Sequence, residues 1–224
     1  MRQIANKLVY DSLAEMAEPS RAALLVVDMQ NDFCSSEGVF GRNGAEVGRI
    51  QAIVPGLRLL MASAREAGVR TMFLRHTHEP DLSNISPARL SFYAALYEGK
   101  TTPYHAIRDT WGHEIIPELE PLPDEAVINK GRSSGFIGTN LDMMLRSNRI
   151  ETVIVTGMAT HACVESTARD AGFLDYYVVV VSDCVADYRE DLHQASLLTL
   201  SQRVVLARSH ELREVWRKTV RGAA

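Results

Sequence analysis

Three reactive side chains follow short apolar runs of the chain. Asp28 closes the run in ALLVVDMQNDF, Lys130 follows AVIN, and Cys163 lies in TGMATHACVES, shortly after TVIV. A thiol can attack a carbonyl carbon, a carboxylate can take the thiol proton and return it to a leaving group, and an ammonium can hold both in place. Together the three residue types indicate nucleophilic catalysis by a cysteine.

The position of Cys163 bears on its reactivity. A helical pattern begins near Ala162, so Cys163 opens a predicted helix, where the positive end of the helix dipole and a nearby lysine would both lower a thiol pKa. Each residue alone also has a simpler interpretation. A cysteine is usually a small buried residue, a lysine a solvated charge and an aspartate a cap. Residue types and spacing leave both interpretations open.

The elements that must position these residues are short strands. Their nearly continuous apolar character is typical of parallel strands covered on both faces. The predicted strands are Ala22–Val27, Thr71–Leu74, Ala126–Ile128, Thr152–Val155, Tyr177–Val181 and Val204–Ala207. The predicted helices are about Val47–Ala67, Asn140–Ser147, Ala162–Leu174, Asp191–Ser201 and His210–Thr219. This alternation predicts an α/β fold, a three-layer α/β/α sandwich whose mainly parallel sheet binds ligands at the carboxyl ends of its strands.

Two helix ends and one long segment complete the organisation. Gly68 is expected to end the first helix in a left-handed conformation, and Thr139 to cap the second. The segment Thr77–Pro123 interrupts the alternation and is rich in proline, polar and aromatic residues. A segment this long is typical of a lid, a substrate loop or an oligomer contact. We expect residues 1–224 to form one domain that carries this excursion at about 77–123.

Composition excludes several classes of protein. The chain has 224 residues, a net charge of −4 and 46% hydrophobic residues, which suits one domain with its own core. The absence of a basic run argues against nucleic acid or a membrane as a partner. Three cysteines are too few for a disulfide scaffold, and the first twenty residues lack the apolar core of a signal peptide. We therefore expect a cytoplasmic protein with free thiols.

The reactive segments resemble the isochorismatase-like superfamily of cysteine hydrolases. The resemblance covers about residues 22–205 and is strongest in ALLVVDMQNDFC, in INKGRSSGFIGTNLDMMLRSNRIETVIVTG and in GMATHACVESTARDA. It implies a Rossmann-like fold in which Asp28, Lys130 and Cys163 match the catalytic triad of the family. It also implies a cis peptide bond between Met158 and Ala159, which points the amides of Ala159 and Cys163 into an oxyanion hole.

The resemblance extends to three substrate-binding positions with less specificity. Phe33 and Phe136 fall where an aromatic ring would face the substrate, and core packing is the alternative for both. Gln202 falls where members similar to biuret hydrolase have a glutamine, and an exposed surface position is its alternative.

Histidines after the second strand raise the question of a metal. Nicotinamidases have metal ligands in this region, but their Trp-His-Pro signature is missing here, and His76 and His78 merely share a strand face. We therefore expect no metal and no cofactor. Further residues near or in the excursion could bind a carbonyl or carboxylate or serve packing: Arg75, His105, Arg108 and Trp111.

The implied activity is amide hydrolysis through a thioester, with release of ammonia. Isochorismatases lack the cysteine, so Cys163 argues against their reaction. HTHEPDLSNISPAR, DFC and Gln202 favour a small linear ureide such as biuret or triuret, whereas CVESTARDA resembles ureidoacrylate amidohydrolases. N-carbamoyl amino acids stay open as substrates, and so does a non-catalytic binding or thiol-redox protein on the same scaffold. We expect a homo-oligomer, either a dimer or a tetramer.

Overall fold

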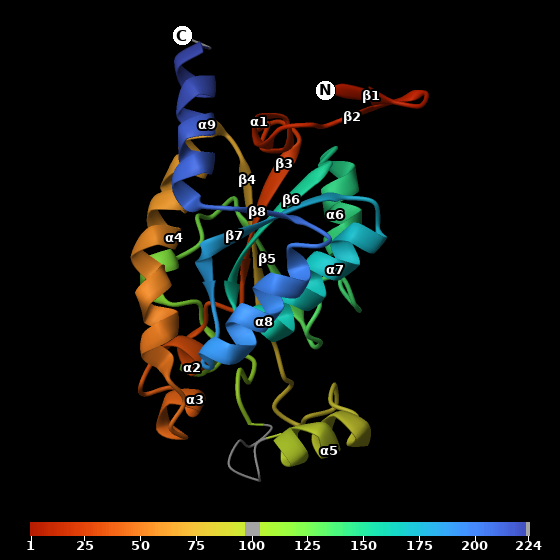
Figure 1. Cartoon of the computed structure of the whole chain (residues 1–224). Coiled ribbons are helices and arrows are strands. Elements are labelled where there is room, and N and C mark those ends of the chain that lie inside the picture. Colours follow the sequence, from red (N-terminus) through yellow and green to blue (C-terminus); the bar gives the residue numbers. More distant parts are fainter. Residues whose placement is uncertain (97–103, 223–224) are drawn as a thin grey trace.

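A six-stranded parallel sheet forms the centre of the computed structural model, which describes residues 1–96 and 104–222 (Figure 1). The strand order is β5-β4-β3-β6-β7-β8, and every neighbouring pair is parallel. The strands are β3 (Ala22–Val27), β4 (Arg70–His76), β5 (Ala126–Lys130), β6 (Thr152–Met158), β7 (Tyr177–Ala186) and β8 (Val205–Ala207). All six predicted strands are present, and the sheet is parallel as expected.

Helices cover both faces of this sheet. Helices α4 (Val47–Ala67) and α9 (Ser209–Gly222) lie on one face, and α6 (Leu141–Ser147), α7 (Glu165–Phe173) and α8 (Glu190–Leu200) lie on the other (Figure 1). The three-layer α/β/α prediction is therefore confirmed. No helix in the described part of the chain is long and apolar enough to cross a membrane.

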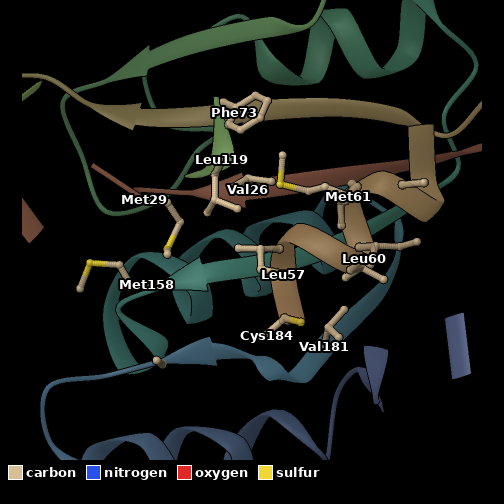
Figure 2. Packing of buried hydrophobic residues seen from close by; sticks show 14 of the residues in the cluster. Val26, Met29, Leu57, Leu60, Met61, Phe73, Leu119, Met158, Val181 and Cys184 are labelled. Atoms are coloured by element: carbon tan, nitrogen blue, oxygen red, sulfur yellow. The ribbon is translucent and has the colours of Figure 1, made fainter. Parts of the chain in front are cut away.

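The central strand β3 shows why the apolar runs are continuous. All six of its residues are buried, and alternate side chains enter two separate clusters. Val26 packs toward α4, with Leu57 and Met61 of that helix in the same cluster, whereas Val27 packs into the cluster beneath α6 and α7 (Figure 2). A strand with two buried faces needs apolar residues at every position, so the period-two alternation of a half-exposed strand is absent.

The two predicted helix ends are present. Gly68 follows α4 with φ 77°, and its amide donates to the last turn of the helix. The hydroxyl of Thr139 accepts a hydrogen bond from the amide of Leu141 at 3.2 Å, although Asn140 is the residue that directly precedes α6. Both ends therefore satisfy backbone groups that the helices leave unpaired.

The structure adds short elements that the sequence patterns did not predict. They are the β1–β2 hairpin (Arg2–Ile4 and Lys7–Val9), α1 (Leu13–Met16), α2 (Asn31–Cys34), α3 (Val39–Arg42), α5 (Pro87–Leu96), and the 3-10 turns η1 (Trp111–His113) and η2 (Pro117–Leu119). Most of these are too short for a hydrophobic period to be visible. Residues 97–103 of the predicted excursion lie outside the described residues.

The predicted helix Ala162–Leu174 also begins differently. A π-helical turn, η3 (Thr160–Val164), precedes α7, and Cys163 lies within this turn. The sequence pattern predicts Cys163 in the first turn of a regular α-helix. That prediction is wrong, because Cys163 lies in the π-helical turn before α7.

One glycine is required where β6 meets β3. Gly157 has φ 101°, and a Cβ atom at this position would lie 2.1 Å from the carbonyl oxygen of Val27. Only glycine combines this backbone conformation with so close an approach. The close approach matters because it holds the residue before Asp28 against the residue before Met158, where β3 and β6 end.

We predict that Gly157→Ala lowers the free energy of unfolding by about 2–3 kcal/mol, because the strands must separate and the backbone must leave its left-handed conformation. Urea unfolding measures this change. Gly172→Ala is the matched control, since its Cβ meets nothing within 4 Å and it lies in α7, where alanine stabilises by up to about 1 kcal/mol. Equal stability of Gly157→Ala and wild type would contradict the prediction.

Candidate active site

Four neighbouring strands bring the reactive residues together at the carboxyl ends of the strands. Lys130 ends β5, His76 ends β4, Asp28 directly follows β3, and Cys163 follows β6. The chain leaves β3 toward β4 and β5 and returns to the other side of β3 with β6, so the topology switches between β3 and β6. Open parallel sheets bind ligands at such a switch point. The structure therefore brings Asp28, Lys130 and Cys163 together where the strand pattern predicted chemistry.

A buried ion pair joins two of these residues across β4. The ammonium of Lys130 donates to Oδ2 of Asp28 at 2.8 Å, and both side chains are almost completely buried. The other carboxylate oxygen of Asp28 accepts from the amide of His76 at 3.0 Å. Asp28 has φ 52°, a conformation that aspartate tolerates better than most residues. The backbone of this residue thus leaves the strand as its carboxylate stays within reach of Lys130.

Lys130 and the two groups beside it influence one another electrostatically. Its ammonium donates to the carbonyl oxygen of Arg132 at 3.1 Å, and the thiol of Cys163 lies close enough to Lys130 and Asp28 to shift the pKa of both. Burial alone lowers the pKa of Lys130, but the Asp28 carboxylate and the thiol beside it raise the pKa by more. Lys130 therefore stays charged.

Burial dominates the protonation of the other two groups. It raises the pKa of the Asp28 carboxyl, although the ammonium of Lys130 opposes the change. It also raises the pKa of the Cys163 thiol to about 12, and the neighbouring Asp28 carboxylate adds to that effect. The expectation of a lowered thiol pKa is therefore wrong for the protein without substrate. The lysine acts in the expected direction, but burial and the carboxylate outweigh it.

The peptide bond between Met158 and Ala159 is cis, as the resemblance implied. Ala159 directly precedes the turn η3, and its carbonyl oxygen accepts from the amide of Val164 at 3.2 Å. Ala159 and Cys163 both line the cavity that contains the reactive group.

This cavity has a volume of about 310 Å³, the lower end of the range of about 300–1,000 Å³ typical of small-molecule sites. Aromatic rings form one wall. Phe33 lines the cavity, as the sequence predicted, and its ring centroid lies 5.1 Å from that of Phe40, which stacks on Tyr188 at 5.5 Å. The flat face of a planar group fits such a wall.

Two predicted substrate-binding residues are not brought to the cavity. The ring of Phe136 lies 6.0 Å from that of Tyr176 and packs with the cluster on the α6–α8 face. The amide of Gly135 donates to the hydroxyl of Thr167 in α7, and Phe136 is not among the residues that line the cavity. Gln202 is exposed after α8. For these two residues, the structure favours the alternatives of packing and surface exposure.

Three further candidates also lie outside the cavity wall. The guanidinium of Arg75 donates to the side chain of Asn129, and Arg108 forms an ion pair with Glu79 at 2.7 Å. Trp111 is half exposed and does not line the cavity. Arg75 and Arg108 are therefore bound to other side chains, and none of the three residues lines the cavity.

His105, by contrast, lines the cavity and completes a buried cluster with His76 and His78. One ring nitrogen from each lies within 4.8 Å of the others. The Nε2 atoms of His76 and His78 are 2.9 Å apart and hydrogen-bonded, which is closer than the roughly 3.3 Å between two ligands of a tetrahedral zinc ion. Burial also holds the pKa of His76 well below its usual value. His76 and His78 are therefore hydrogen-bonded to each other in this arrangement, and the ring nitrogens of all three histidines lie close enough together to hold a metal ion.

Sequence reasoning missed two residues that hold the site in place. Gln30 accepts from the amide of His76 at 2.7 Å and donates to the carbonyl oxygens of His76 and His113. The carboxylate of Asp32 accepts from the amide of Ala106 at 2.7 Å, which fixes the chain beside His105. The sequence feature that could have revealed both residues is the polar run in VVDMQNDF, which directly follows a buried strand.

The chain belongs to the isochorismatase family, because the sequence model of the isochorismatase domain matches residues 22–211. It is 37% identical over 172 residues to ureidoacrylate amidohydrolase RutB of Cronobacter sakazakii, covering 74% of each chain. A cysteine hydrolase from Pseudomonas syringae pv. phaseolicola has a TM-score of 0.78 at 28% identity, covering 90% of this chain and 94% of that one. N-carbamoylsarcosine amidase from Thermoplasma acidophilum has a TM-score of 0.67 at 30% identity, covering 84% and 96%.

Within that family the chain is an amidohydrolase, an enzyme that acts on carbon–nitrogen bonds other than peptide bonds. The names of these relatives, amidohydrolase, cysteine hydrolase and amidase, agree with a site that carries a thiol.

The raised thiol pKa makes a direct prediction. A thiol of pKa about 12 is ionised in roughly one molecule in ten thousand at pH 8, so iodoacetamide should alkylate Cys163 more than about tenfold more slowly than free cysteine. Asp28→Asn removes the anion that raises this pKa and should speed alkylation. Mass spectrometry follows the rate, and Cys163→Ala reports the background from Cys34 and Cys184. Rapid alkylation of the wild type at pH 8 contradicts the prediction.

Proposed function

We propose that this enzyme hydrolyses a small ureide by means of Cys163, Asp28 and Lys130. The observation that carries the proposal is the buried ion pair between Lys130 and Asp28, with the Cys163 thiol close enough to shift the pKa of both and with Asp28 and Cys163 in the same cavity wall. The arrangement brings a nucleophile, a proton acceptor and a fixed cation together.

In the first half of the reaction, Asp28 takes the proton of Cys163 as the sulfur attacks the carbonyl carbon of the substrate. The raised pKa of Asp28 makes it a stronger base than an exposed carboxylate. The amides of Ala159 and Cys163 donate to the oxyanion, and each such donor is worth roughly 3–4 kcal/mol in related acyl transfers. Substrate binding must precede proton transfer, because the thiol is neutral before it.

In the second half, the protonated Asp28 returns that proton to the leaving nitrogen, and the carbon–nitrogen bond breaks to leave a thioester on Cys163. A water molecule then loses a proton to Asp28 and attacks the thioester carbonyl. The sulfur leaves, regains the proton from Asp28, and the acid product departs. Lys130 stays charged throughout and holds Asp28 in position.

The substrate that we propose is a ureido or N-carbamoyl carboxylic acid of the ureidoacrylate type. The sequence patterns favoured biuret or triuret, but Gln202, one of the features behind that preference, does not line the cavity. The relatives named ureidoacrylate amidohydrolase, at 30–37% identity, support the alternative. Phe33 would pack against the flat ureide group.

A thiol-redox role has less support. Oxidation by peroxide begins from the thiolate, and sensor cysteines have low pKa values and accessible sulfurs. The pKa of Cys163 is raised to about 12. We therefore retain hydrolysis as the proposed function.

An ammonia-release assay tests the proposal on ureidoacrylate, N-carbamoylsarcosine, biuret, triuret and nicotinamide. We expect turnover of a ureido or N-carbamoyl acid, with kcat lowered by more than about 10³-fold in Cys163→Ala, because the nucleophile is lost. The control Cys34→Ala removes a buried thiol outside the triad and should retain activity. Turnover of biuret alone would show that the substrate belongs to the biuret class. Absence of ammonia release from every compound would contradict the ureide proposal.

The proposed base also predicts a pH profile. A protonated Asp28 cannot take the thiol proton, so kcat/KM should fall as pH decreases through the Asp28 pKa. Burial raises this pKa, so the decline should begin above the range near pH 4 of an exposed aspartate. Circular dichroism at each pH separates loss of activity from loss of fold. A value of kcat/KM that stays constant down to pH 4 would contradict the assignment of Asp28.

A further inference from the structure

A cation from the excursion faces the same cavity as the nucleophile. Arg89 belongs to α5, which lies beyond the carboxyl ends of the strands and apart from the helices that cover the sheet (Figure 1). Its side chain lines the cavity together with Cys163 and Ala159. We propose that Arg89 binds the carboxylate of the substrate and so determines specificity for acids over neutral ureides. This inference rests on the proposed function.

The guanidinium of Arg89 is held from two elements. Its Nε donates to the hydroxyl of Tyr93 at 3.2 Å, and its Nη2 donates to the hydroxyl of Ser133 at 3.4 Å. The group also lies 4.9 Å from the ring centroid of Tyr93, which is buried. These contacts use two of the five N–H donors of the guanidinium, and no other residue of 1–96 and 104–222 accepts from the remaining three. A held guanidinium loses less conformational freedom when it binds a carboxylate.

The ion pairs that the described residues form at the cavity do not include Arg89. Asp28 pairs with Lys130, and His161 pairs with Asp187, which raises the pKa of His161. Among residues 1–96 and 104–222, no carboxylate forms an ion pair with Arg89. A half-buried cation beside an aromatic wall favours a ligand that brings a negative charge.

The substrate chemistry fits this distribution of groups. A ureido acid has a carbamoyl group that is cleaved and a carboxylate some atoms away, whereas biuret and triuret have no anionic group. The planar fork of a guanidinium binds a carboxylate through two parallel hydrogen bonds. Arg89 would therefore hold the carboxylate while the carbamoyl carbon lies against Cys163. The excursion then serves as a substrate loop, one of the roles that its length suggested.

The test compares an acid with a neutral molecule of the same shape. The probes are 3-ureidopropionate and 3-methylbutylurea, and their Kd values are measured by calorimetry on Cys163→Ala, which does not depend on turnover. We expect Arg89→Gln to weaken binding of the acid by about 10- to 100-fold and to change the neutral compound far less, with Arg89→Lys between. Arg108→Gln is the matched control, because Arg108 pairs with Glu79 and does not line the cavity.

Two results overturn the inference. In the first, Arg89→Gln weakens the binding of the acid and of the neutral compound equally. In the second, the acid binds to Cys163→Ala no better than the neutral compound does. Turnover separates this failure from that of the proposed function. A wild type that hydrolyses ureides with no preference for acids retains the function but loses the role of Arg89. A wild type that binds acids through Arg89 yet hydrolyses none retains the binding site but loses the function. Thermal melting of each variant controls for unfolding.

Discussion

The buried ion pair between Lys130 and Asp28 is the interaction on which the site depends. Removing two charges from water costs several kcal/mol for each ion, so such a pair persists only where further hydrogen bonds satisfy both partners. Here the amide of His76 satisfies the carboxylate and the carbonyl of Arg132 satisfies the ammonium. These partners lie at the ends of adjacent strands, and the pair spans the strand between them. The register of the sheet therefore fixes the positions of Lys130 and Asp28 relative to each other.

The same burial controls protonation in the protein without substrate. Burial raises the pKa of the Cys163 thiol, which therefore stays neutral, and it also raises the pKa of the Asp28 carboxyl. A proton moves between them at lower cost when the pKa values of donor and acceptor approach each other. In the proposed mechanism, a substrate carbonyl that accepts the sulfur completes this transfer. Lys130 would stay ionised throughout, and the thiolate would form only as the substrate reacts.

The strands and their reactive ends could be predicted from the sequence because both signals are local. A doubly covered strand such as β3 is apolar throughout, and a polar residue directly after it marks the ligand-binding edge. Arg89 and His105 could not be assigned, since their position beside Cys163 depends on how the excursion folds back over the sheet. Phe136 was predicted by analogy, but its ring packs beside Tyr176 and does not line the cavity. The thiol pKa was missed because burial cannot be read from a motif.

The position of α5 has a consequence for how such enzymes diversify. Bond cleavage is encoded by strand ends that cannot move without disturbing the sheet, whereas Arg89 is carried by an insertion between two strands. Insertions of this kind tolerate changes in length and composition far better than the strands they connect. Exchange of the residues around Arg89 between homologues would, on this proposal, change which amides bind while Asp28, Lys130 and Cys163 stay in place. Substrate choice and bond cleavage would then be carried by separate parts of the chain.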